Sequence, residues 1–306
     1  MHLRLARLTL QRRDLDRWAV IYLIASGLYP FISRQPPTGP WPRLALHAGL
    51  ALAIWFLPPL ARGSRLGAVR LMGEIYLPCV FPLFYSEMAQ LGLVFHDFAH
   101  SLDPAFIALE EKLFGVQLSL VWSQRWPWPW LHELFEFAYF SYYLFSALVL
   151  VLIMTSRRLA PSERWTALRA FMRDLSATML VCYTLYTFFP VWGPKYFRAG
   201  PVTVDGWIFT RVMRHIHEHG AILGAAFPSS HVAATLIPWW HGWKIAPRSR
   251  PWLTTLFILL AAATVYCRYH YVVDVIAGLL LGALILWLGE HYGERESRLP
   301  RLRAGG

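Results

Sequence analysis

Residues 270–289 read HYVVDVIAGLLLGALILWLG, and this stretch decides the fold class. It is long enough to cross a bilayer as one helix, and Asp274 is its only acidic residue. Seven further stretches of predominantly apolar residues precede it in the chain. The sequence therefore predicts an all-α, polytopic transmembrane helix bundle of about eight spans, the others covering residues 18–33, 44–61, 71–95, 131–155, 171–190, 229–246 and 252–268.

The composition supports a membrane protein and argues against several other classes. Of the 306 residues, 56% are hydrophobic and only 15% are charged, which is too apolar for an ordinary soluble domain. The net charge of +11 comes from short basic clusters between apolar runs, so we expect no nucleic-acid partner. Cys79, Cys182 and Cys267 are odd in number and lack metal-ligand spacing, so they indicate neither a disulfide framework nor a metal site.

The basic clusters also predict an orientation. Eight spans place every cluster on the same side of the bilayer, which by the positive-inside rule is the cytoplasm. Both termini are then cytoplasmic, in a plasma membrane or a bacterial-type inner membrane. The opposite, outer side receives residues 96–130, residues 191–228 and the tight turn at residues 268–270.

Three polar clusters fall at these predicted outer ends. They are Gly193-Pro-Lys-Tyr-Phe-Arg198, Phe227-Pro-Ser-Ser-His231 and Arg268-Tyr-His-Tyr-Val-Val-Asp274. In the second cluster, Ser229 can cap a helix whose free N–H groups form an anion site beside His231. In the third, His270 and Asp274 are four residues apart, so on a helix the carboxylate can orient the imidazole and raise its basicity.

These residue types suit phosphoryl transfer. One histidine can attack phosphorus and form a phosphohistidine while the other protonates the leaving oxygen. Lys195, Arg198 and Arg268 would supply positive charge around the phosphoryl oxygens. The scheme requires no metal ion and no organic cofactor.

At these residues the chain resembles the type 2 phosphatidic acid phosphatase superfamily. The Pro-Ser-x-His motif matches residues 228–231, the His-x3-Asp motif matches residues 270–274, and the resemblance covers roughly residues 165–290. It implies a six-helix-type phosphatase core in the C-terminal part, with His270 as nucleophile, Asp274 as its orienting partner and His231 as general acid. It also implies that the Ser229 side chain and the Ser230 amide bind the phosphate.

The chain departs from the family pattern at two positions. Thr264 stands where an arginine is usual in the third motif, and Val202 stands where the arginine of the first motif would be. Lys195 and Arg198 look like a shortened substitute for that first motif. The His-Tyr-x-x-Asp form is similar to the branch that contains inositol phosphorylceramide synthases, whose members transfer the group to an alcohol.

The chain is thus interpreted as one membrane domain over residues 1–306. Residues 1–130 would be accessory spans with an interfacial segment, residues 131–290 the catalytic helix bundle, and residues 291–306 a basic cytoplasmic tail. The expected function is a lipid phosphatase acting on a phosphate or diphosphate, with a lipid phosphotransferase as the alternative enzyme.

A non-enzymatic channel or transporter stays open as well, because Glu74, Glu87 and Asp174 lie in apolar stretches. The run His215-x-His217-x-His219 resembles a metal-ligand set, but residues 211–219 are more typical of an interfacial helix. Gly278 and Gly282 continue the face of His270 and predict close helix packing behind it. The oligomeric state does not follow from the sequence.

Overall fold

The computed structural model describes residues 12–32, 40–95, 101–220 and 222–292. Within these ranges the chain is almost entirely helical, and the one β-bridge joins Val191 to Ala225. The helices are α1 (Arg12–Ile32), α2 (Pro40–Arg62), α3 (Gly67–Phe95), α4 (Asp103–Phe114), α5 (Leu118–Arg125), α6 (Pro129–Phe140), α7 (Tyr142–Thr155), α8 (Pro161–Phe188), α9 (Pro194–Phe197), α10 (Ile208–Gly220), α11 (Ser230–Ile245), the short 3₁₀-helix η1 (Pro247–Ser249), α12 (Arg250–Tyr266) and α13 (Val272–Tyr292).

Each predicted apolar stretch is largely helical where the structure describes it, which confirms the all-α class. Among the described residues, three helices are long and apolar enough to cross a membrane by length and composition: α2, residues 67–88 of α3, and α13. The pair α6 and α7, bent by 50° at its break, makes a fourth if it is one span. The full count of eight spans stays a prediction.

The break between α6 and α7 was not predicted, because residues 131–155 were read as one span, opened by Glu133 and Glu136. It falls at Ser141, whose hydroxyl donates to the Ala138 carbonyl at 2.5 Å. A serine that hydrogen-bonds back to its own helix favours a bend at that point. The break lies between two tyrosines, Tyr139 and Tyr142, that both contact the candidate site.

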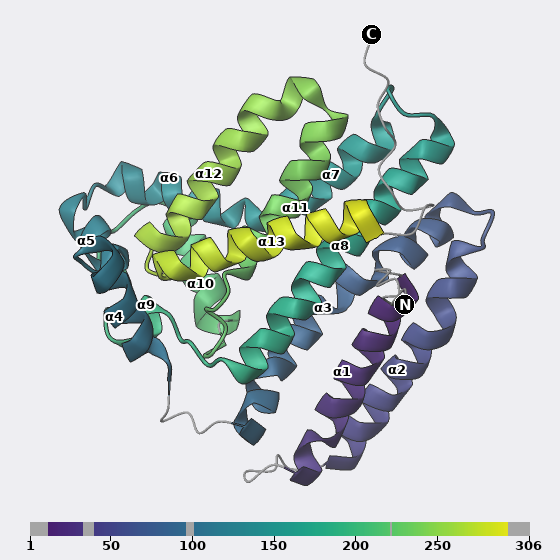
Figure 1. Ribbon diagram of the computed structural model, residues 1–306, viewed down its shortest axis with the longest axis horizontal. Coiled ribbons are helices and arrows are strands. Elements are labelled where there is room, and N and C mark those ends of the chain that lie inside the picture. Colours follow the sequence, from purple (N-terminus) through teal and green to yellow (C-terminus); the bar gives the residue numbers. More distant parts are fainter. Residues whose placement is uncertain (1–11, 33–39, 96–100, 221, 293–306) are drawn as a thin grey trace, which may run out of the picture.

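Helix α8 lies at the centre of the bundle and is buried around most of its circumference. It packs against α3 on one side and against α11 and α13 on the other (Figure 1). Where α13 crosses α11, a Cβ atom at Gly278 would lie 2.5 Å from the Ser229 carbonyl oxygen, and one at Gly282 would lie 3.0 Å from that of Ala233. The close packing predicted from these two glycines is confirmed.

Helices α1, α2 and α3 form a group beside α8 (Figure 1). Glu74 pairs with Arg169 at 3.1 Å, and Glu87 pairs with Arg43, so both of these buried carboxylates join helices. Both carboxylates thus form ion pairs between helices of the bundle. The surfaces of α1 and α2 that do not pack against other helices are apolar, as contact with lipid requires. Their exposed side chains include Ile21, Trp41, Leu46, Phe56 and Leu60.

Candidate active site

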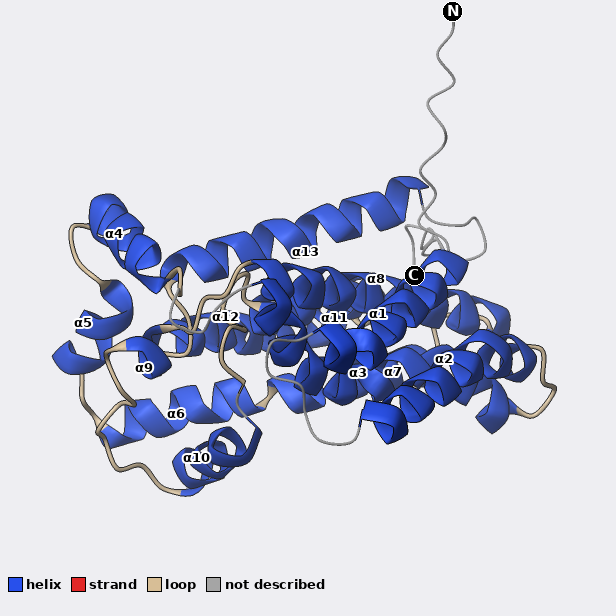
Figure 2. Ribbon diagram, turned by 90° about the horizontal axis from the view of Figure 1, so that it is seen from below, coloured by secondary structure: helices blue, strands red, loops and turns tan. Residues whose placement is uncertain are grey.

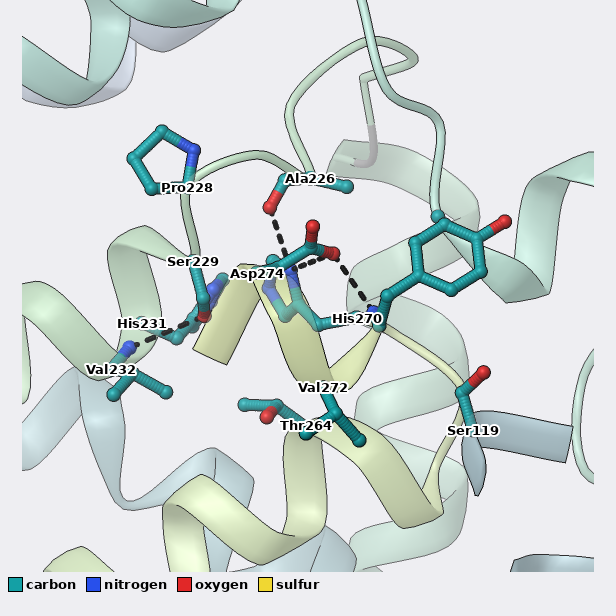
Figure 3. Close-up of polar contacts among 12 residues, drawn as sticks. Ser119, Ala226, Pro228, Ser229, His231, Val232, Thr264, His270, Val272 and Asp274 are labelled. Carbon is teal, nitrogen blue, oxygen red and sulfur yellow. Dashed lines mark hydrogen bonds and ion pairs between the residues drawn. The ribbon is translucent and has the colours of Figure 1, made fainter. Parts of the chain in front are cut away.

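The two predicted histidines come together at one end of the bundle. His231 is the second residue of α11, and His270 lies in the turn between α12 and α13. Their ring centroids are 5.8 Å apart, at an interplanar angle of 58°. Figure 3 shows His231, His270 and Asp274 grouped around the beginning of α13.

The Nδ1 atom of His270 has two polar partners. Its Nδ1 lies 2.9 Å from the Ala226 carbonyl oxygen and 3.5 Å from Oδ2 of Asp274 (Figure 3). Because a carbonyl oxygen only accepts, Nδ1 must carry the proton, and the lone pair of the neutral ring lies on Nε2. The Asp274 carboxylate is itself held by the Tyr271 amide, which donates to Oδ2 at 2.8 Å.

This geometry brings His270 and Asp274 together as predicted, with one difference. His270 precedes the helix, so the two do not form a helical i, i+4 pair, and the nearer partner of Nδ1 is the Ala226 carbonyl. Sequence reasoning missed Ala226, since a backbone carbonyl leaves no signal in residue identity.

His231 lies between two tyrosine rings that flank the break after α6. Its ring stacks on Tyr139 at 4.5 Å and 30°, and its centroid is 4.4 Å from that of Tyr142. The Tyr139 hydroxyl is 3.0 Å from Nε2 and 3.2 Å from Nδ1 of His231. The bend at Ser141 thus places two aromatic rings against one imidazole.

Ser229 is the N-cap of α11, as predicted. Its Oγ accepts a hydrogen bond from the Val232 amide at 3.4 Å, and its own amide donates to the Asp274 carbonyl at 3.0 Å. The Ser230 amide, expected on the phosphate, instead donates to the Tyr186 hydroxyl at 3.1 Å. Tyr186 reaches it from α8 and donates in turn to the Pro228 carbonyl at 2.9 Å.

Lys195 contacts the turn that carries His270. Its amide donates to the Arg268 carbonyl at 2.8 Å, and its Nζ is 4.9 Å from the centre of the Tyr269 ring. Burial lowers the pKa of Lys195, and the nearby Glu136 carboxylate opposes that shift. Arg198 is exposed and packs over the Phe197 ring at 4.9 Å.

The Arg268 side chain is used to hold loops together. Its Nε donates to the Ser123 hydroxyl at 3.0 Å, and its NH1 donates to the Ala199 carbonyl at 3.0 Å and to that of Pro201 at 3.3 Å. Its backbone adopts a left-handed φ of 63°, which is unfavourable for a residue with a side chain. These contacts explain a structural role for Arg268, and its predicted contact with phosphate stays a prediction.

A third histidine, His217, also lies at the site and was missed as a site residue. Its ring is 4.3 Å from that of Tyr269 and 5.8 Å from that of Tyr139. Burial lowers the pKa of His217 to about 3, and the positive charge of Lys195 acts in the same direction.

The other two histidines of the run point elsewhere. The rings of His215 and His219 lie 4.3 Å apart at a tilt of 44°, and His219 Nδ1 contacts the His215 carbonyl at 2.8 Å. The run therefore lies on helix α10, as predicted, and does not gather its three rings around one point. Glu133 holds the beginning of α10 by accepting from the amides of Trp207 and Phe209 at 2.7 and 2.6 Å.

Helix α4 connects two of the three polar clusters. Asp103 accepts from the Trp192 amide at 2.7 Å, the Gly193 amide at 2.9 Å and the Tyr271 hydroxyl at 2.8 Å. Glu110 accepts from the Val272 amide at 2.9 Å, and burial raises its pKa. Figure 2 shows α4, α5, α9 and α10 gathered at one end of the molecule. The predicted outer segments thus meet, and α4, assigned by sequence to the accessory part, supports the site directly.

Two comparisons with known proteins gave a match. The family model described as PAP2 superfamily matches residues 105–288, beginning inside α4. A PA-phosphatase related-family protein of Dictyostelium discoideum is 25% identical over 179 residues, which cover 52% of this chain and 32% of that protein. The match thus spans about a third of the relative's length, and no solved structure matches the chain.

The family match covers more than half of the chain. With the long apolar helices, it indicates a membrane protein. The chain belongs to the PAP2 superfamily.

Proposed function

We propose that the protein hydrolyses a lipid phosphate or diphosphate through a phosphohistidine formed on His270. The observation that carries this proposal is the pair of contacts to Nδ1, from the Ala226 carbonyl at 2.9 Å and from Asp274 at 3.5 Å. They leave the lone pair on Nε2, in a ring whose centroid is 5.8 Å from that of His231. A nucleophile with an orienting partner and a second histidine within reach meets the needs of covalent phosphoryl transfer.

In the first step, Nε2 of His270 attacks phosphorus, and the bond from phosphorus to the leaving oxygen breaks. As general acid, His231 gives a proton to that oxygen, and the Asp274 carboxylate balances the positive charge that develops on the His270 ring. In the second step, water attacks phosphorus and gives a proton to His231. The phosphorus–nitrogen bond breaks, and the electron pair returns to Nε2.

Binding of the phosphoryl oxygens would rest on Lys195 and on the beginning of α11. Lys195 is the cation whose ammonium lies beside Tyr269, next to His270 in the chain. The N-terminal end of α11, capped by Ser229, adds the positive end of a helix dipole. Because Thr264 stands where the family usually has an arginine, more of the positive charge around the phosphate would have to come from Lys195.

The lipid part of the substrate would be held by the bilayer and by apolar helix faces. Helix α13, which begins two residues after His270, exposes Leu280 and Leu284 by 67% and 50%. Such a face suits an acyl or prenyl chain whose phosphate reaches the end of the bundle. By the predicted topology this end is the outer face, with both termini in the cytoplasm.

The acceptor is tested by following both products. The purified protein is given a panel of lipid phosphates and diphosphates, with and without added headgroup alcohols, while inorganic phosphate and lipid products are measured together. Hydrolysis predicts free phosphate that does not depend on the alcohol, and the His270→Ala variant should release none. Phosphate recovered only in a new lipid ester would establish the phosphotransferase and contradict hydrolysis.

A further inference from the structure

A second cluster of chemically reactive side chains lies beside the turn that carries His270. His132 and Glu136 are one helical turn apart on α6, and Cys267 follows the last residue of α12. One nitrogen, one carboxylate oxygen and the sulfur all lie within 4.8 Å of one another. The exposed fractions are 3%, 5% and 2%, so all three are withdrawn from solvent.

The apolar surroundings of this cluster make its polar groups costly to bury without a partner. Phe135, Ala263 and Tyr266 pack around it, and a carboxylate in such surroundings requires compensation. The Tyr269 hydroxyl donates to the carboxylate of Glu136, 2.9 Å from each oxygen. His132 faces Glu136 through Nε2, and among the described residues its buried Nδ1 has no hydrogen-bond partner and would stay off the metal.

We propose that His132, Glu136 and Cys267 bind a zinc ion. Imidazole, carboxylate and thiolate are the three ligand types that zinc accepts, and neighbouring ligand atoms in its tetrahedral sites are about 3.5 Å apart. The distance from His132 Nε2 to Glu136 Oε1 is 3.5 Å, so the α6 pair has this separation before any movement. Side-chain rotation of Cys267 would close the remaining distances.

The charges also balance. Binding releases the thiol proton of Cys267, and the thiolate and the carboxylate together neutralise a divalent cation. Lys195 is close enough to Glu136 to interact with it and would repel the ion, but the two anionic ligands outweigh one ammonium. The Tyr269 hydroxyl then becomes the outer partner that orients the carboxylate ligand. A water molecule would complete the tetrahedron.

A zinc ion bound by these residues would join α6 to the turn that carries His270. Cys267 lies three residues before His270, and α6 carries Tyr139 against His231. An ion held by both elements would fix the two histidines relative to each other without taking part in the chemical step. Sequence alone gave no sign of it, because the ligands are far apart in the chain.

The test measures metal directly. Protein purified from zinc-supplemented cells is analysed for metal content, and metal-stripped protein is titrated with Co²⁺, which takes zinc sites and reports a thiolate ligand by a near-ultraviolet charge-transfer band. We expect near-stoichiometric zinc and this band in the unaltered protein. Cys182→Ser, which alters another buried cysteine, should keep both.

The variants separate loss of a ligand from loss of folding. Cys267→Ser should lose the charge-transfer band while its elution from a sizing column is unchanged, and His132→Ala should lower bound zinc about tenfold or more, as expected for removal of a ligand. Substoichiometric zinc in the unaltered protein, or a cobalt band that survives Cys267→Ser, would overturn the site and leave a hydrogen-bonded cluster.

Discussion

Helix α11 carries a histidine near each of its ends, and each belongs to a group that contains a buried aspartate. At one end His231 faces His270, which contacts Asp274. Toward the other end, His241 lies with its Nε2 3.0 Å from Oδ2 of Asp174 on α8. The same residue types thus occur about 15 Å apart along one helix, given a rise of 1.5 Å per residue.

The two groups differ in which nitrogen is engaged. The carboxylate at His241 binds Nε2, and Asp174 also accepts from Arg173 at 2.8 and 2.7 Å, so the charges are matched inside the core. A Cβ atom at Gly289 would collide with both Arg173 and Asp174, so α13 closes over the group. His270 is held through Nδ1, which leaves Nε2 for a substrate. The first arrangement is a buried charge network within the core, and the second leaves free the nitrogen that the proposed mechanism uses as nucleophile.

The largest expected effect separates the two groups by activity. Replacing His270 by Ala should reduce turnover about a thousandfold or more, because the attacking nitrogen is lost. His241→Ala should keep turnover per folded molecule and lower the unfolding temperature, since it leaves the Asp174–Arg173 pair short of a partner. Turnover and thermal unfolding of the two purified variants, measured side by side, check this difference.

A thousandfold loss in His241→Ala at unchanged folding would show that both groups are catalytic. Retained turnover in His270→Ala would remove the proposed nucleophile.

The next effect distinguishes the acid from the nucleophile. His231→Ala should slow turnover of a lipid phosphate by about a hundredfold or more, because the leaving alkoxide is no longer protonated. A substrate with a much more acidic leaving group needs less protonation and should lose far less. Rates for a pair of substrates that differ in leaving-group pKa provide the measurement. Equal losses for both substrates would speak against general acid catalysis by His231.

Of the two aspartates, Asp174 should matter more for stability and Asp274 more for turnover. Asp174→Asn removes the charge that faces Arg173 in the core and should destabilise the protein by about 3 kcal/mol or more. Asp274→Asn can still accept from the Tyr271 amide, so its unfolding temperature should fall less while its turnover falls further. Unfolding and turnover, measured on the same preparations, test whether the two variants rank oppositely in stability and in activity. Parallel losses in both variants would erase the distinction.

The smallest expected effect concerns pH. Burial lowers the pKa of Lys195, so the free enzyme should lose this charge at a lower pH than an ordinary lysine would. KM for a lipid phosphate should therefore rise at high pH, and in Lys195→Arg the rise should move to higher pH because the guanidinium stays charged. Lys195→Met should raise KM by roughly tenfold below that pH. A KM profile unaltered by either substitution would remove Lys195 from phosphate binding.

Much of this arrangement could be predicted from residue patterns. Apolar runs located the helices, and Pro228 to His231 and His270 to Asp274 identified the two motifs whose histidines meet. Ser229 was correctly predicted as a cap, because capping depends on local geometry. The break at Ser141 was missed, since one serine in an apolar run has little effect on periodicity.

The supporting contacts could not be predicted, because they depend on tertiary structure. Asp103 and Glu110 look like ordinary surface residues of a short helix, yet they hold loops far along the chain. The Ala226 carbonyl and the Tyr186 hydroxyl are set by how α8 and the loop before α11 pack. His217 was visible only as part of a histidine run, and its position depends on which face of α10 packs against α6.

The most direct test of the central claim is to trap the covalent intermediate. Protein mixed with labelled lipid phosphate is quenched in alkali within milliseconds and digested, and the label is located by mass spectrometry. We predict an acid-labile, base-stable phosphoramidate on His270 that is absent from His270→Ala and present in His241→Ala. Turnover without any labelled histidine, or label on a residue other than His270, would contradict the proposed mechanism.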